Sequence, residues 1–283
     1  MACLFVEQLT VLDFSRLDRE RGLVGESWIV DLELEGDLDH QSMVLDFGEV
    51  KRVARQAVEA CADHRLLVPT LGNAVIAEAG GLVRVTWRWG TGRSLEVGSP
   101  AGAFAFVPSE QVDPATLRPI LVEAVGRVVP ANVRAVRISL REEDRPGHYY
   151  HYSHGLKRHQ GLCQRIAHGH RSRIEIWKDG ARAPDLERAW AERWRDIYLG
   201  SEDDLVGGDK DAAGGRIEFA YEAPEGRFEL AIDRACCEVV PSDSTVECLA
   251  AYIAGELARE APGHRFRVRA YEGVNKGAAA GSG

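Results

Sequence analysis

The sequence predicts an α+β protein built from two tandem copies of one unit, each an antiparallel sheet with its helices on one face. Segments in which apolar and polar residues alternate, typical of strands, are interrupted by amphipathic helical segments. The order of these segments in residues 1–143 repeats in residues 147–275. Residues 276–283, dominated by glycine and alanine, are predicted to form a flexible tail.

The composition is that of a globular protein. Of the 283 residues, 45% are apolar and 28% are charged, which suffices for a sizeable core. No apolar run reaches the ~18–20 residues of a membrane-spanning helix, and the N-terminus lacks a basic, cleavable leader. The formal net charge of -9 disfavours binding to nucleic acid. The six cysteines have no regular spacing, so a cytoplasmic protein with reduced thiols is predicted.

Both copies begin alike. Each opens with an aromatic–serine pair, Phe14-Ser15 and Tyr152-Ser153, and passes through a polar, glycine-containing loop. Each then enters an alternating segment, residues 28–34 in the first copy and 174–177 in the second, which predicts a strand.

A helix is predicted next in each copy. Residues 49–64 carry apolar side chains at helical spacing. Residues 184–199 begin with a proline suited to the first turn and place Leu186, Trp190, Trp194 and Ile197 on one face.

The remaining segments of the two copies also correspond. Two hairpins are predicted, residues 82–89 with 94–97 and residues 216–221 with 227–232. Each copy then has a Val-Pro-Ser turn, an amphipathic helix and a last strand that ends at Glu142 or Glu272. Such units leave sheet edges open, so association into a homo-oligomer is predicted.

Six of the nine histidines lie between His148 and His170. In an extended segment His168 and His170 point to the same side, and His154 on the preceding strand can join them by cross-strand pairing. Three neutral imidazoles with one open position are typical of catalytic zinc. A solvated, histidine-rich loop is the competing interpretation, and the alternative ligands are His148, His151 and His159.

Cys163 lies among these histidines and is open to three interpretations: a metal ligand, an ordinary buried thiol, or an acid–base group activated by a nearby cation. The first copy has no cysteine in this loop, and its residues aligned with the three histidines are Arg16, Val24 and Glu26. The first copy is therefore predicted to bind no metal.

The first copy instead carries Asp63-His64 at the end of its helix, where the aligned second copy has Asp203-Asp204. A carboxylate beside an imidazole suits acid–base chemistry, although a surface helix end that favours a charged histidine is the simpler alternative.

Together these motifs resemble the 6-pyruvoyltetrahydropterin synthase and 6-carboxytetrahydropterin synthase family, twice along the chain. The resemblance lies in the H…C…HGH set, the Asp-Phe-Gly stretch before a helix that ends in Asp-His, and the final glutamate. The Pro-Ser turns, where the family is expected to have Pro-Thr, and Arg171-Ser172, where an aromatic residue often follows, depart from the pattern.

The resemblance implies two tandem tunnelling-fold (T-fold) domains that assemble into barrels. It also implies a zinc ion held by His154, His168 and His170. Cys163 would then be the general base, and Asp63 and His64 would relay protons. Glu272 or Glu142 would anchor the pterin ring, with Ser242 of the Pro-Ser turn beside the substrate.

The implied substrate is 7,8-dihydroneopterin triphosphate. The expected product is 6-carboxy-5,6,7,8-tetrahydropterin, as in queuosine biosynthesis, with 6-pyruvoyltetrahydropterin formed by triphosphate elimination as the alternative. A non-catalytic T-fold binding or assembly module is the competing class. Whether Asp63-His64 acts within its own chain or on a neighbouring one stays open from the sequence.

Overall fold

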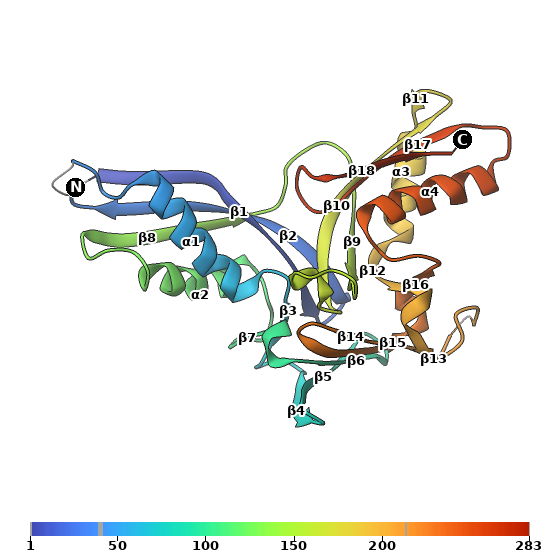
Figure 1. Cartoon of the computed structure of the whole chain (residues 1–283), viewed down its shortest axis with the longest axis horizontal. Helices are drawn as coiled ribbons and strands as arrows, with labels where there is room; N and C mark the ends of the chain where they lie inside the picture. The colour runs from blue at the N-terminus through green and yellow to red at the C-terminus, as the bar shows by residue number, and fades with distance from the viewer. Residues whose placement is uncertain (1, 39–41, 213, 283) are drawn as a thin grey trace.

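The computed structural model describes residues 2–38, 42–212 and 214–282 and shows an α+β protein (Figure 1). Within these ranges the strands form three sheets, and four α-helices pack against them. No helix in the described ranges is long and apolar enough to cross a membrane.

The elements of the two halves follow one another in the same order. The first half contains β1 (Ala2–Asp18), β2 (Gly22–Gly36), α1 (Phe47–Ala62), β3 (Leu66–Pro69), β4 (Val75–Ala79), β5 (Leu82–Trp89), β6 (Arg93–Ser99), β7 (Phe104–Val107), α2 (Pro114–Gly126) and β8 (Val133–Arg141). The second half contains β9 (His148–His154), β10 (His168–Lys178), β11 (Ala181–Arg182), α3 (Pro184–Arg193), β12 (Arg195–Ser201), β13 (Leu205–Gly207), β14 (Arg216–Ala223), β15 (Gly226–Asp233), β16 (Cys237–Val240), α4 (Val246–Glu260), β17 (Phe266–Tyr271) and β18 (Gly277–Gly281).

The sheet order is also the same in both halves. The first sheet runs β7-β3-β1-β2-β8, and the second runs β16-β12-β9-β10-β17, with β18 added at its edge. The strand registers agree residue by residue: Arg16 pairs with Val24 in the first sheet, and His154 pairs with His168 in the second. Residues on the paired strands of one half therefore have definable counterparts in the other.

The two sheets are not purely antiparallel, which corrects the prediction. β3 runs parallel to β1 and to β7, and β12 runs parallel to β9 and to β16. The remaining neighbours in both sheets are antiparallel. The helix that follows the second strand of each half carries the chain across the sheet, so the next strand can run in the direction of the first.

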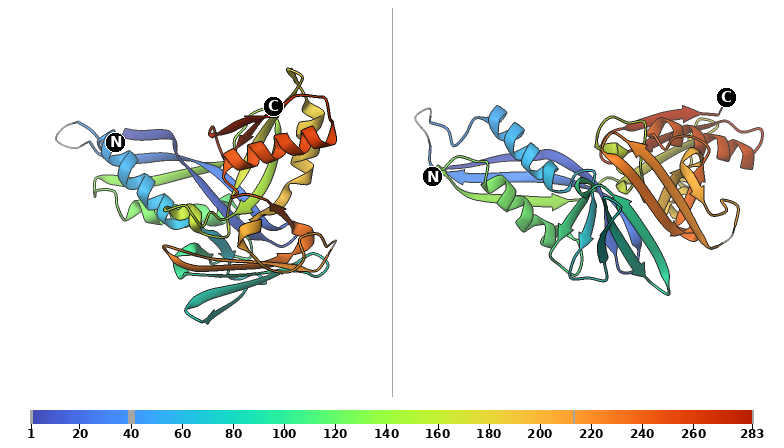
Figure 2. Two further views of the ribbon diagram at one scale, coloured as in Figure 1. Left: turned by 45° about the vertical axis from the view of Figure 1, so that its right-hand side comes forward. Right: turned by 60° about the horizontal axis from the view of Figure 1, so that its bottom comes forward.

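Both halves contribute to the third sheet, whose order is β13-β14-β15-β6-β5-β4. Each half supplies one hairpin, and the two hairpins join where β15 pairs with β6. This sheet lies beneath the two larger sheets in Figure 2, left. The sequence predicted both hairpins, but their joining is a contact between the halves that no local pattern encodes.

The helices of each half cover one face of its sheet. Val50, Ala54 and Val58 of α1 and Leu121 of α2 pack with Leu12 and other apolar residues of β1 and β2 in one core. The helix α3 is shorter than predicted, because β12 begins at Arg195. Ile197, predicted on the helical face, lies in that strand, where the β-branched and aromatic run Ile197-Tyr198-Leu199 is favoured.

The two large sheets cross where glycine permits close contact. A Cβ on Gly25 would lie 1.9 Å from the Tyr152 carbonyl oxygen, and one on Gly169 would lie 2.4 Å from the same atom. Gly25 and Gly169 are counterparts in the two registers. The glycine of the His-Gly-His motif is therefore required by the crossing of the halves.

The C-terminal segment differs from the predicted flexible tail. Gly277–Gly281 forms β18, which pairs antiparallel with β17 along its length. The small side chains of Ala278 and Ala280 pack against the core to which α4 contributes. The pairing of β18 with β17 satisfies the backbone N–H and C=O groups at the edge of β17. Gly283 lies outside the described residues.

Candidate metal and acid–base site

Three histidines converge inside the second sheet. His154 ends β9, and His168 and His170 open β10 directly opposite it. All three side chains are buried, and their ring centroids lie 4.4 to 5.6 Å apart. Coordinating nitrogens of the three rings all lie within 4.8 Å of one another, so one metal ion could contact all of them.

The Nδ1 atoms of these rings face acceptors of the protein. The contacts are His154 Nδ1 with Ser244 O at 3.0 Å, His168 Nδ1 with Arg165 O at 2.8 Å, and His170 Nδ1 with Asp13 Oδ1 at 3.3 Å. The three Nε2 atoms have no hydrogen-bond partner among the described residues, and neither has His170 Nδ1, which approaches Asp13 only as an ion pair. Buried acceptors without partners are costly, and a metal ion satisfies such nitrogens. The residues therefore fit a zinc ion bound through Nε2.

The protonation of the cluster agrees with this fit. Burial holds the pKa values of His154 and His168 well below the ordinary value, and the neighbouring rings add to the effect. Both imidazoles are therefore neutral, as metal ligands must be.

Asp13 brings the first half into this cluster. It is buried and accepts a hydrogen bond from Ser27 Oγ at 2.5 Å. Burial would raise the pKa of Asp13, but His170, Lys276 and the Ser27 hydroxyl outweigh burial and hold it well below its usual range. An ionised carboxylate thus lies behind His170, and the candidate metal centre is shared between the two halves.

Asp63-His64 lies beside the same cluster in the same chain. His64 adopts a left-handed backbone conformation with φ of 52°, and its Nδ1 lies 2.7 Å from Asp63 Oδ2. The other Asp63 oxygen accepts from the Asp13 backbone N–H at 2.9 Å. The His64 ring lies 5.1 Å from that of His168, so the pair faces the histidine cluster of the other half.

Cys163 completes this arrangement. It lies in a short 3-10 turn, Leu162–Gln164, and polar atoms of His64, Cys163 and His168 lie within 4.8 Å of one another. Burial would lower the pKa of His64, but the hydrogen bonds with Asp63 and Cys163 raise it to about 10. The Asp63–His64–Cys163 series can therefore hold and pass a proton at the rim of the cluster.

His64, Cys163 and His168 form a second group that could hold a metal ion. His64 and Cys163 are only half-buried, and they already interact with each other and with Asp63. The Nε2 atoms of the three buried histidines have no such partners. The geometry therefore favours the histidine cluster for the metal and leaves His64 and Cys163 for proton transfer.

The two candidate anchor glutamates lie at different places. Glu272 Oε1 is 4.0 Å from His170 Nε2, and its other oxygen is 3.8 Å from Lys276 Nζ. Glu142 instead lies 3.0 Å from Arg171 Nε and lines a pocket of the first half. Glu272 is thus the glutamate beside the cluster.

The other candidate residues have different contacts or positions. Ser242 donates to the carbonyl of Asp243, whereas Ser244, which the sequence did not single out, contacts His154. His151 Nδ1 bonds to the Gly25 carbonyl, and His159 Nδ1 accepts from the Gly161 N–H. His148 opens β9 at the end opposite His154.

The counterpart of His64 is Asp196, which corrects the sequence alignment with Asp203-Asp204. Ser15 pairs with Leu66, and its counterpart Ser153 pairs with Tyr198, so Leu66 matches Tyr198 and His64 matches Asp196. Both residues have left-handed backbones, with φ of 52° and 54°. The sequence alignment was displaced because the predicted helix ran through Asp196.

Part of the first half matches a known protein family. The model of the family described as 6-pyruvoyl tetrahydropterin synthase matches residues 11–89. The match lies wholly within the first half and covers less than half of the chain. The matched residues include Asp13, Asp63 and His64, whereas the histidine cluster lies beyond them in the second half.

Solved structures of the family resemble half of the chain. The 6-pyruvoyl tetrahydropterin synthase of Plasmodium vivax matches with a TM-score of 0.42 and 17% identity, covering 51% of this chain and 93% of that one. The Plasmodium falciparum enzyme matches with a TM-score of 0.41 and 15% identity, covering 49% and 90%. No curated protein matches the chain.

Proposed function

We propose that the protein is a zinc-dependent pterin synthase that converts 7,8-dihydroneopterin triphosphate and water into 6-carboxy-5,6,7,8-tetrahydropterin, acetaldehyde and triphosphate. The observation that carries the proposal is the set of three buried, unpartnered Nε2 atoms beside Cys163 and the Asp63-His64 pair. The match of residues 11–89 to the 6-pyruvoyl tetrahydropterin synthase family suggests the substrate class.

His154, His168 and His170 would hold the zinc ion, which would polarise a side-chain oxygen of the substrate and acidify the adjoining C–H bond. The protein fixes the ligands in advance, because Ser244, Arg165 and Asp13 orient the three rings through Nδ1.

Proton transfer falls to the residues at the rim. Cys163 would take a proton from the substrate side chain as its thiolate, and the raised pKa of His64 means that this imidazole is charged near neutral pH and stabilises the thiolate. Asp63 keeps the ring in place through its 2.7 Å contact with Nδ1. His64 can then return a proton to the opposite side of the reacting carbon or to the leaving triphosphate.

Glu272 would bind the ring of the substrate. A carboxylate that faces an amino group and a ring N–H makes two parallel charge-assisted hydrogen bonds. Lys276 Nζ lies 3.8 Å from Glu272 Oε2 at the edge of the cluster.

Formation of 6-pyruvoyltetrahydropterin is the second candidate. The description of the matching family and the names of the Plasmodium enzymes favour it. Both reactions start from the same triphosphate and would use the same residues, so the product itself must decide between them.

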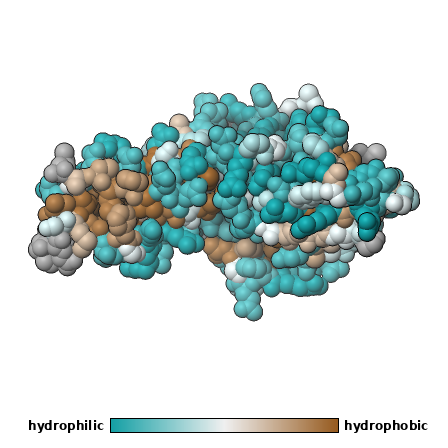
Figure 3. All heavy atoms as spheres, turned by 90° about the horizontal axis from the view of Figure 1, so that it is seen from above, coloured by the Kyte–Doolittle hydropathy of each residue, from teal (hydrophilic) through white to brown (hydrophobic). Residues whose placement is uncertain are grey.

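We also propose that each half, residues 1–143 and 147–275, is a T-fold domain, and that chains associate through their sheet edges into barrels. The outer strands β7, β8 and β16 present edges that the described strands leave unpaired. Figure 3 shows apolar surface along the first half. Phe5 of β1 is 64% exposed. A monomer in size-exclusion chromatography would contradict this part of the proposal.

The variant Cys163→Ala tests the mechanism. Turnover should disappear while zinc content stays unchanged, because the thiol lies outside the histidine cluster. Cys3→Ala, which changes an exposed cysteine, is the matched control. Full turnover in Cys163→Ala would remove the proposed base.

A further inference from the structure

The first half contains a pocket at the place that corresponds to the histidine cluster. Its volume is about 300 Å³, and Arg16, Glu26 and Glu142 contribute to its walls. In the shared registers these residues are the counterparts of His154, His170 and Glu272. The pocket is therefore the image of the candidate catalytic site under the internal symmetry.

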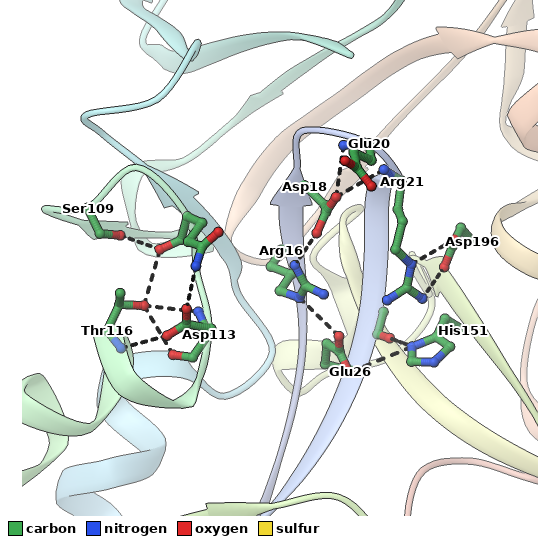
Figure 4. A network of polar contacts seen from close by, with 12 residues as sticks. Arg16, Asp18, Glu20, Arg21, Glu26, Ser109, Asp113, Thr116, His151 and Asp196 are labelled. Atoms are coloured by element: carbon green, nitrogen blue, oxygen red, sulfur yellow. Dashed lines mark hydrogen bonds and ion pairs between the residues drawn. The ribbon is translucent and has the colours of Figure 1, made fainter. Parts of the chain in front are cut away.

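Fixed ion pairs stand in this pocket where the other half has metal ligands and acid–base groups (Figure 4). Arg16 Nε donates to Glu26 Oε1 at 2.9 Å, so a guanidinium takes the place of a cation bound by histidines. Arg21 binds both oxygens of Asp196, the counterpart of His64, at 2.9 and 2.5 Å. The pocket therefore contains charged side chains. It lacks the histidine ligands and the acid–base histidine of the other half.

One wall of the pocket has an unsatisfied acceptor. The Glu26 side chain is 3% exposed, and its Oε2 has no hydrogen-bond partner among the described residues. His151 Nδ1 stays 3.6 Å away because it donates to the Gly25 carbonyl at 2.8 Å. Burial raises the pKa of Glu26, against the effect of Arg16. A buried carboxylate oxygen of this kind favours a ligand that brings an N–H donor.

The mouth of the pocket carries Glu142, whose side chain is 53% exposed and lies 3.0 Å from Arg171 Nε. Trp28 also lines the pocket. A flat ring with a row of N–H donors fits this combination, because it can contact an indole and bond to carboxylates through its edge.

We propose that this pocket is a second, metal-free binding site for a planar 2-amino-4-oxo heterocycle, the ring edge that pterins and guanine share. Glu142 accepts from the amino group and the adjacent ring N–H, and Arg16 donates to oxygen on the far side of the ligand. Because the correspondence of Glu142 with Glu272 suggests this ligand class, the inference rests in part on the proposed function. The site binds and does not catalyse.

The test uses the full-length chain with its candidate catalytic site disabled by Glu272→Gln and by removal of zinc with a chelator. Pterin, which is fluorescent, is titrated into this protein, and guanosine is added as a competitor to distinguish the two sources of the ring. One pterin should still bind per chain. Adding Glu142→Gln should weaken this binding by about ten-fold, the usual scale of one lost charge-assisted hydrogen bond.

Glu110→Gln is the matched control, because Glu110 is 70% exposed, pairs with Arg19 and does not line the pocket. It should leave pterin binding unchanged. Glu142 is also exposed, so its substitution should not disturb folding.

Loss of all pterin binding in the Glu272→Gln, zinc-free chain would overturn the inference, as would binding that Glu142→Gln leaves unchanged. Neither result bears on turnover at the other site. Conversely, a zinc-loaded chain that binds pterin through Glu142 but converts no triphosphate would overturn the proposed function and leave this second site standing.

Discussion

The hydroxyl oxygens of Ser15 and Ser153 lie 2.7 Å apart. The two serines are counterparts in the two halves, so their contact marks the internal two-fold axis. Asp13 and His151 are also counterparts, and each reaches across this axis. Asp13 lies 3.3 Å from His170, whereas His151 lies 3.6 Å from Glu26. In both contacts the first half supplies the carboxylate and the second half supplies the imidazole.

The contact between Asp13 and His170 predicts that the first half contributes to metal affinity. Asp13→Ala removes the carboxylate that fixes the His170 ring, and zinc affinity should fall by about 10- to 100-fold. Competition with a chromophoric chelator measures this directly. Asp31→Asn, which changes a carboxylate on β2 that pairs with Arg141, should leave the affinity as it is. Equal zinc affinity in Asp13→Ala and the parent would show that His170 needs no partner.

The placement of Asp63-His64 predicts that the active site is completed within one chain. His64→Ala and Cys163→Ala should each be inactive, and mixing the two variants after reversible dissociation should restore nothing. An arrangement in which His64 served a neighbouring chain would instead give hybrid assemblies with intact sites. Recovery of turnover in the mixture would therefore place the acid–base pair on another subunit.

The matching registers predict that a metal site can be rebuilt in the first half. Arg16→His, Val24→His and Glu26→His together would reproduce the positions of His154, His168 and His170. Zinc content should rise from about one to about two ions per chain, as judged by elemental analysis. A triple variant that folds but still binds one ion would contradict the internal symmetry.

The close crossing of the two sheets predicts that a single methyl group added at Gly169 strongly destabilises the fold. Gly169→Ala would place a Cβ 2.4 Å from the Tyr152 carbonyl and 2.6 Å from Ser15 Oγ, and the free energy of unfolding should fall by about 2–3 kcal/mol. Gly255→Ala is the control, since a Cβ there meets nothing within 4 Å and the position is helical. Chemical denaturation should find Gly255→Ala unchanged or more stable by about 0.5–1 kcal/mol.

Sequence reasoning located much of the candidate site because the repeat fixed the register. The alignment of Arg16, Val24 and Glu26 with the three histidines agrees with the strand pairing of both sheets. Alternation and helical periodicity likewise located the hairpins and most helices. These features depend on neighbours in the sequence or on strict repetition.

The features that the sequence did not indicate depend on contacts between distant segments. Asp13 and Ser244 orient His170 and His154 from other parts of the chain, and nothing in their own surroundings in the sequence distinguishes them. Ser244 follows Ser242 by two residues, so the Pro-Ser turn pointed to this segment but did not single out the residue that contacts His154. The end of α3 was misplaced because its apolar spacing continues into β12, which led to the wrong counterpart for His64.

The measurement that decides the function is incubation of the zinc-loaded protein with 7,8-dihydroneopterin triphosphate, followed by mass analysis of the pterin products. We expect the substrate to be consumed, triphosphate to be released, and 6-carboxytetrahydropterin to appear, with no conversion by Cys163→Ala. Accumulation of 6-pyruvoyltetrahydropterin would retain the mechanism and change the product. Recovery of the substrate unchanged from a chain that carries zinc would contradict the proposal that this protein is a pterin synthase.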